Sequence, residues 1–579
     1  MFDITKNNAV KFAGADCCTG SACCFSGAEA PTVADTVVYG KIYTSNSNGD
    51  YAQAFAVKDG KYVYVGSVEG AQEYIQEGTT KIIDHRDKGL VMAGATEGHG
   101  HYAMDGFLYY TNYFITGLTE EEILANAKKY VEANPGKDVY YTFGWNNETM
   151  EDYKAVIDMR TKLDAICSDK PMMIGDDSGH NAFCNTKAFE MAGVTKDTEL
   201  SGGLFARNES GELLGLVSDM ANNFVLKNVV AKQALITEKD YEGVYNAMKT
   251  KLHGYGYTYI QDAWLNYFGT QVMDCLSYCE KKDGLSIVVG GCHEIDPYDD
   301  WQSEIAKAEE YGKKYTSKHL KYNTIKLFSD GEAVESKSGW LLEGYLDGSH
   351  GAQVWETPVI NEIVKTANAK GMSVHIHAQG DAASEQAVNA FINAESTKTG
   401  TIFNGFCHGR NITEETKKKM SEHNIYAAIN INWRLLSRAN ATSMIEDIVS
   451  MDLAKGGYPV KSLLDKGINV SSSTDAPATS GAPADICGIM EVAVNGTHGF
   501  EDVFPLDDSE KVSIEEALNI MTINGAKQLM IEDERGSIET GKYADFLLLD
   551  KDITACATDK IHEGKVANVY FEGEEVYSA

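Results

Sequence analysis

The amino-acid sequence predicts an α/β protein whose centre is a (β/α)8, TIM-like barrel. Eight apolar segments after residue 89 have the length of buried strands. Helix-length segments separate most of them, which is typical of βαβ units and a parallel sheet. Both ends of the chain are instead rich in short strands. With 579 residues, 43% of them hydrophobic, the chain can bury the core that this architecture needs.

The barrel is expected over residues 89–530, interrupted by a long insertion. Its strands are predicted at 90–96, 257–262, 285–291, 323–328, 372–377, 402–407, 425–430 and 468–473. The gap between the first two strands is far too long for one helix, so residues 105–250 are predicted to form an inserted subdomain. That subdomain has strand-like segments near 138–144 and 171–175, and helix-like segments at 119–133 and 239–252.

The two ends of the chain are expected to form a small β-sandwich domain, from residues 34–88 together with 531–579. Asp59-Gly60 separates two β-rich segments and predicts a hairpin turn. Ser513-Ile-Glu-Glu516 is a capping box and predicts a helix that runs to about residue 530. Residues 1–33, rich in Cys, Gly and Ala, are interpreted as an N-terminal extension.

Composition narrows the class of protein. A net charge of −34 disfavours nucleic acid as a partner, because phosphate binding needs clustered Lys and Arg. No apolar run has the length of a membrane span, and the first residues lack the order of a secretion signal. Scattered cysteines favour a cytoplasmic protein. Four further cysteines are clustered near the N-terminus: Cys17, Cys18, Cys23 and Cys24. This cluster could bind a soft metal, form a redox pair or belong to a flexible tail, and a peripheral role is favoured. The sequence leaves open whether the protein forms a homodimer.

Polar residues recur at the ends of the predicted barrel strands, where (β/α)8 barrels carry their chemistry. His99 and His101 are two residues apart, so in a strand they face the same side. Later strands end in further candidates: Lys326, His375, His377, His408 and Asp475. Imidazole and carboxylate together suit zinc or another first-row divalent metal. His293 and Glu294 also end a strand, but no motif supports a role for them, and a structural one is expected.

The chain resembles the amidohydrolase superfamily, specifically amidohydrolase family 3, the branch that contains N-substituted formamide deformylases. The opening motif stands here as Met92-Ala-Gly-Ala-Thr-Glu97-Gly-His99-Gly-His101, with the usual proline missing and Glu97 in place of aspartate. Further matches run from about residue 35 to the end and include segments 179–188, 325–331, 376–381, 407–408 and 473–477. Residues 1–33 fall outside the resemblance.

The resemblance implies a role for each matching position. His99 and His101 would bind one metal, and His377 and His408 a second or shared one. Lys326 would bridge as a carbamate formed with CO₂, although a lysine at the barrel mouth with its amine in water is the alternative. Asp475 would be both metal ligand and proton shuttle. The alternative is that Asp475 only shapes a turn. His180 is the candidate for contacting substrate, and the alternative is that it only fixes its own loop. Residues expected to support the site are Glu97, His375, Asp330 and Asp381.

We therefore expect a metal-dependent hydrolase that cleaves a carbon–nitrogen bond, other than a peptide bond, in a small molecule. A metal-activated water would attack an amide, formamide or cyclic amide, with one or two ions, zinc being favoured. The alternatives are a hydrolase or lyase acting on an ester or carbon–carbon bond, or a non-catalytic binding barrel. Aromatic residues of the insert could line the pocket or belong to its core: Tyr109, Tyr110, Tyr113, Phe114 and Trp145.

Overall fold

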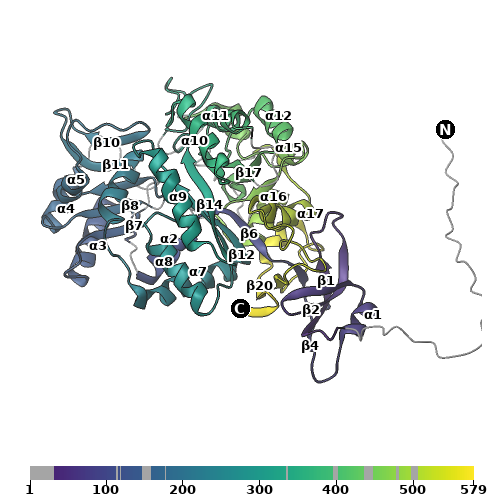
Figure 1. Ribbon diagram of the computed structural model, residues 1–579. Coiled ribbons are helices and arrows are strands. Elements are labelled where there is room, and N and C mark those ends of the chain that lie inside the picture. The colour runs from purple at the N-terminus through teal and green to yellow at the C-terminus, as the bar shows by residue number, and fades with distance from the viewer. Residues whose placement is uncertain are drawn as a thin grey trace, which may run out of the picture.

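The computed structural model describes residues 32–111, 115–117, 119–145, 158–176, 178–333, 337–395, 402–435, 448–477, 482–496 and 506–579. The cysteine cluster Cys17, Cys18, Cys23 and Cys24, as well as Tyr113 and Phe114, lie outside these residues. Three sheets organise the described chain (Figure 1): the barrel in the middle, the sheet of the insert on one side and the sheet of the chain ends on the other.

Eight parallel strands form the barrel and confirm the predicted fold class. They are β6 (Ala95–Gly100), β12 (Tyr257–Asp262), β13 (Val288–Glu294), β14 (Leu320–Phe328), β15 (Ser373–Ala378), β16 (Gly405–His408), β17 (Tyr426–Ile429) and β18 (Val470–Ser472). Each pairs with the next in chain order. The ring closes just beyond β18, where Asp475 N donates to His99 O at 2.9 Å and His101 N donates to Ala476 O at 2.7 Å. First and last strands therefore meet at the predicted metal ligands.

The first predicted strand, 90–96, is two strands in the structure. Residues Leu90–Ala93 form β5, which pairs with strands of both chain ends, and only β6 enters the barrel. Gly94 separates them, and a Cβ at this position would collide with Thr258 Oγ1. Both segments are fully buried, so the hydrophobic pattern carries no signal of the break.

Helices cover the outside of the barrel because each presents one apolar side. In α9 (Trp301–Tyr315), for example, Ile305 and Ala308 are buried at helical spacing. The others are α7 (Tyr241–Tyr255), α8 (Gln271–Lys282), α10 (Thr357–Ala369), α11 (Asp381–Asn393), α12 (Glu414–His423), α14 (Met451–Lys455), α15 (Lys461–Leu464), α16 (Ile486–Asn495), α17 (Ile514–Met521) and α18 (Ile523–Gln528). The capping box of Ser513 and Glu516 opens α17 as predicted, but the helix breaks at Thr522 before α18.

Strands from the two chain ends share one eight-stranded sheet. Its members are β1 (Thr36–Tyr43), β2 (Tyr51–Lys58), β3 (Lys61–Gly66), β4 (Lys81–Asp84), β5, β19 (Phe546–Leu549), β20 (Val566–Phe571) and β21 (Glu574–Ser578). β5 lies between β1 and β19 and so joins the N-terminal strands to the C-terminal ones. Asp59 and Gly60 form the predicted hairpin turn between β2 and β3.

The insert contains a five-stranded sheet in the order β10-β11-β9-β8-β7. Its strands are β7 (Tyr140–Trp145), β8 (Met172–Asp176), β9 (Asn181–Cys184), β10 (Gly203–Arg207) and β11 (Leu213–Asp219), and its helices are α2 (Tyr102–Thr111), α3 (Glu120–Ala133), α4 (Met159–Ile166), α5 (Thr186–Ala192), α6 (Met220–Val225) and the π-turn η2 (Leu226–Val230). Trp145 packs in a core of the insert's own, stacked on Phe183. None of the helices in the described chain has the length and apolar character needed to cross a bilayer.

Candidate active site

Two histidines and one carboxylate meet where the barrel closes. Asp475 Oδ1 lies 3.2 Å from His99 Nε2 and 3.1 Å from His101 Nε2. His99 and Asp475 are buried, yet this oxygen has no hydrogen-bond partner. Asp475 also has a φ of 59°, a conformation that non-glycine residues adopt mainly where the fold demands it. Three electron-pair donors so close together, without a hydrogen bond between them, fit ligands arranged around a cation.

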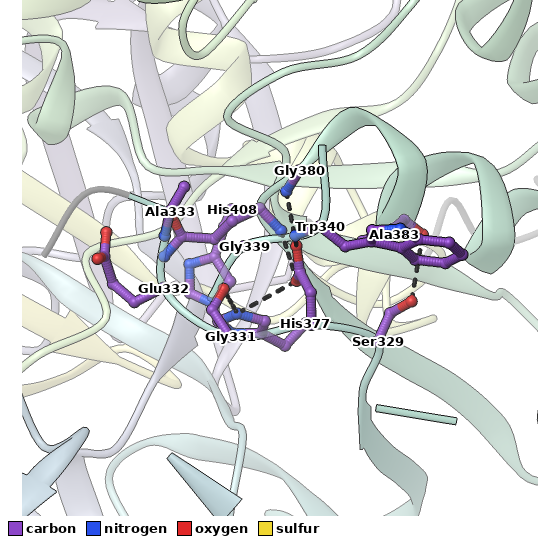
Figure 2. A network of polar contacts seen from close by, with 12 residues as sticks. Ser329, Gly331, Glu332, Ala333, Gly339, Trp340, His377, Gly380, Ala383 and His408 are labelled. Atoms are coloured by element: carbon purple, nitrogen blue, oxygen red, sulfur yellow. Dashed lines mark hydrogen bonds and ion pairs between the residues drawn. The ribbon is translucent and has the colours of Figure 1, made fainter. Parts of the chain in front are cut away.

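His377 and His408 extend this cluster from the ends of β15 and β16. Their ring centroids are 4.3 Å apart, and the His408 ring lies 4.8 Å from that of His99. His408 Nδ1 is 3.0 Å from Asn430 Oδ1, and His377 Nε2 is 3.2 Å from Gly331 O, a contact drawn in Figure 2. Each histidine therefore has one nitrogen fixed by the protein, which is how ligand imidazoles are usually oriented.

Lys326 is buried at the centre of the cluster, on β14, with 1% of its surface exposed. Its Nζ lies 3.6 Å from Cys407 Sγ and 4.7 Å from the centroid of the Phe328 ring. An ammonium group is costly in such surroundings. Burial and the charge of Lys326 hold the pKa values of His99 and His408 well below the usual range, so both imidazoles are neutral and able to bind a metal.

Glu97 and His375 support the histidine pair from below. Glu97 Oε1 accepts hydrogen bonds from His99 N and Thr474 N at 3.1 and 2.9 Å, and burial raises the pKa of Glu97 to about 8. His375 Nε2 is 2.7 Å from His99 Nδ1, and its Nδ1 is 2.7 Å from Tyr426 OH. His99, His375 and Cys407 also form a compact triad. The 2.7 Å between the two nitrogens is a hydrogen-bond distance, shorter than the spacing of two ligands on one zinc.

Asp330 and Asp381 organise the loops around His377. Asp330 accepts hydrogen bonds from Gln379 N, Gly380 N and Trp340 N at 2.8 to 3.0 Å; the amides of Gly380 and Trp340 are shown in Figure 2. Burial raises the pKa of Asp330 to about 8. Asp381 accepts from Leu342 N at 2.8 Å. These carboxylates thus order backbone rather than face the cavity.

A cavity opens above the cluster. Its lining is His99, His101, Met104, Phe143, Ser178, Gly179, His180, Asp219, Met220, Asn223, Trp264, Tyr267, Lys326, Phe328, His377, His408, Asp475 and Pro477. The insert supplies one wall of it. Of the aromatic residues named from the sequence, the three that the structure describes do not line it: Tyr109 and Tyr110 are exposed, and Trp145 lies in the insert core.

His180 enters the cavity from the insert, together with a partner that sequence reasoning missed. Its Nδ1 is 2.7 Å from Asp219 Oδ1, and its ring centroid is 5.9 Å from that of His377. Burial opposes protonation, but the hydrogen bond and charge of Asp219 raise the pKa of His180 to about 9. Asp219 follows the apolar segment 213–217, but an acid at a strand end does not by itself indicate which distant residue it contacts.

Comparison with known proteins places this barrel and cluster in a class. Residues 82–577 match the amidohydrolase family, and the chain belongs to that family. It is 25% identical over 546 residues to the putative amidohydrolase YtcJ of Bacillus subtilis, covering 93% of this chain and 98% of that protein. It is 24% identical over 553 residues to the N-substituted formamide deformylase of Arthrobacter pascens, covering 93% and 97%.

A solved structure shows the same fold. An uncharacterized metal-dependent hydrolase from Pyrococcus horikoshii OT3 superposes with a TM-score of 0.69 at 22% identity, over 90% of this chain and 99% of that one. Membership of the amidohydrolase family makes the protein a hydrolase that acts on carbon–nitrogen bonds, with a candidate metal site at the barrel mouth.

Proposed function

We propose that this hydrolase cleaves an amide, formamide or cyclic amide bond of a small molecule and depends on a divalent metal, zinc being favoured. The observation that carries the proposal is that the Nε2 atoms of His99 and His101 both lie within 3.2 Å of Asp475 Oδ1 at the cavity. A buried carboxylate oxygen without a hydrogen-bond partner beside two imidazoles is costly unless a cation completes the group. Eight free cysteines in the described chain support a reducing, cytoplasmic setting.

The chain offers a full ligand set for one or two ions. His99, His101 and Asp475 would hold one, and His377, His408 and a carbamate on Lys326 would complete a second or shared position. When bound, such a metal lowers the pKa of a water molecule and polarises the substrate carbonyl. Imidazole and carboxylate donors are the set that zinc prefers.

Asp475 is the residue we assign to proton transfer. Asp475 Oδ1 faces the ring nitrogens of His99 and His101, and a cation bound among these three groups would keep the buried carboxylate ionised at neutral pH. In that state the carboxylate can accept the proton of the attacking water. It then returns that proton to the departing nitrogen, which cannot leave as an anion. The acyl carbon keeps the water oxygen, so the products are a carboxylic acid and an amine.

The carbamate on Lys326 would remove the cost of its buried charge. The neutral amine attacks CO₂, a nitrogen–carbon bond forms, one proton leaves, and the side chain becomes an anion. Reconstitution of metal-free protein should then be faster with bicarbonate present. A Lys326→Ala variant should bind less metal, and bicarbonate should have no effect on it.

Metal removal tests the proposed function directly. Protein stripped with a strong chelator should lose hydrolysis of N-acyl and N-formyl amines, and Zn²⁺, Mn²⁺ or Co²⁺ should restore it. Metal analysis of the purified protein gives the number of ions. Hydrolysis that is indifferent to stripping would overturn the proposal, and products of ester or carbon–carbon cleavage would redirect it.

A further inference from the structure

Asp219 engages His180 through both its backbone and its side chain. The backbone N of Asp219 donates to His180 O at 2.7 Å, while Oδ1 lies 2.7 Å from His180 Nδ1. Asp219 holds the position of the N-cap of α6, yet its carboxylate makes no capping hydrogen bond. The side chain is therefore committed to His180 in place of the helix that follows it.

The second oxygen of this carboxylate is held by the barrel. Ser338 Oγ, in the loop that follows β14, donates to Asp219 Oδ2 at 2.8 Å. Asp219 is 5% exposed and has a φ of 50°, a backbone conformation that is strained for a residue other than glycine. Such strain persists only where the surroundings impose it, and here it aims the carboxylate at His180.

The arrangement determines which nitrogen of His180 faces the cavity. With Nδ1 turned to Asp219, Nε2 stands at the opposite edge of the ring, and both residues line the cavity above His99, His101 and Asp475. A carboxylate at Nδ1 requires a proton on that nitrogen and stabilises the doubly protonated ring, whose Nε2–H is a donor. Amide hydrolysis builds negative charge on the carbonyl oxygen, which such a donor stabilises.

We propose that Asp219 is a positioning residue, fixed by Ser338, that holds His180 with Nε2–H directed at the carbonyl oxygen of the substrate. This inference rests on the proposed function. The inference extends the proposed function, because it gives the insert a part in transition-state stabilisation in addition to covering the cavity.

Kinetics of single and double variants test the proposal. Asp219→Asn keeps the shape of the side chain and removes its charge, and should lower kcat about 100-fold with little change in KM. His180→Ala should give a loss of similar size, and adding Asp219→Asn to it should cost no more. Asp176→Asn is the matched control, because Asp176 is another buried carboxylate and accepts hydrogen bonds from Ser178 and Asn181 of the same loop. Additive losses in the double variant would overturn the inference.

A measurement without substrate separates this inference from the proposed function. The Nδ1 proton of His180 should give a far-downfield proton NMR resonance that is lost in Asp219→Asn and His180→Ala but kept in Asp176→Asn. Metal content should be equal in all of these variants. A resonance that survives in Asp219→Asn would overturn the role of Asp219, whereas a metal-loaded wild type that hydrolyses no amide would overturn the proposed function instead.

Discussion

The side chain of Asp475 is almost completely removed from water. It is 6% exposed, and two imidazoles face its Oδ1. In the proposed function this oxygen has two tasks, to complete the ligand set and to carry a proton. An amide in its place would keep the size of the side chain and lose the basicity.

Asp475→Asn should accordingly abolish turnover while metal stays bound through the histidines. The expected loss in kcat is at least about 100-fold, the lower range for removal of a general base. Metal content and kcat measured on the same preparation check this. A variant with near-normal kcat would show that another group moves the proton.

His375 acts on the site through His99, according to its contacts. The chain of hydrogen bonds from Tyr426 to His375 to His99 turns the Nε2 of His99 toward Asp475. His375→Leu should weaken metal binding by about 10- to 100-fold, as loss of such partners does. Competition with a chelator measures this. His253→Leu is the matched control: that histidine is also buried and hydrogen-bonded, to Ser286 O, but lies outside the site. Equal losses in both variants would point to general destabilisation.

At the scale of elements, the sequence predicted what periodicity and strand ends can encode. The barrel strands and the insert follow from the spacing of apolar segments. Polar residues at the ends of those segments indicated six candidates, and the structure brings them together: His99, His101, Lys326, His377, His408 and Asp475. Residues whose role depends on a distant partner could not be found this way. Asp219 acquires meaning only beside His180 and Ser338, and the division of 90–96 into two strands depends on Thr258 and on the C-terminal β19.

Glu294 is a second case: a structural role was expected for it at the end of a strand, but its partners could not be identified from the sequence. At the end of β13, Glu294 and Asp296 are completely buried, and Lys227 from η2 of the insert reaches both of them as well as Asp299. Burial and the charge of Asp296 raise the pKa of Glu294 well above the usual range, while the same carboxylates raise that of Lys227 against the effect of burial. One lysine thus fastens the insert to the barrel.

Lys227→Met should destabilise the protein by about 3 to 5 kcal/mol, because it leaves buried carboxylates without a counter-charge. Urea unfolding measures the change. The variant Lys227→Met with Glu294→Gln and Asp296→Asn should recover part of the loss. If the single variant is as stable as the wild type, the fastening contributes little.

At the scale of the whole molecule, charged residues join the barrel to the sheet of the chain ends. His319, just before β14, lies 3.1 Å from Glu280 of α8 and 3.0 Å from Glu572, in the turn between β20 and β21. Arg535 contacts Glu572 and, at 2.6 Å, the buried Asp545. Three parts of the chain that are distant in sequence meet in this clasp of His319, Glu280, Glu572, Arg535 and Asp545.

The clasp predicts a pH dependence of stability. Burial opposes it, but the two glutamates raise the pKa of His319 above 6.5, and His319 helps to lower those of Glu280 and Glu572 to about 2. The contribution of His319 is therefore complete below pH 6.5 and is lost as pH rises through its folded-state pKa. That of the glutamates is complete above their usual 4.5 and is lost as pH falls toward 2.

The free energy of unfolding, measured at about pH 6 and about pH 9, checks the direction of this pH dependence. Wild type and His319→Gln are compared, both treated with a chelator. The wild type should lose more free energy of unfolding over this interval than the variant. Equal slopes would remove His319 as the source.

The closure of the barrel makes catalysis a property of the nearly complete chain. His99 and His101 stand on the first barrel strand and Asp475 follows the last, held together by two backbone hydrogen bonds. Under the proposed function, a polypeptide that ends before residue 475 would keep both histidines but lack the carboxylate that completes the metal site and transfers the proton.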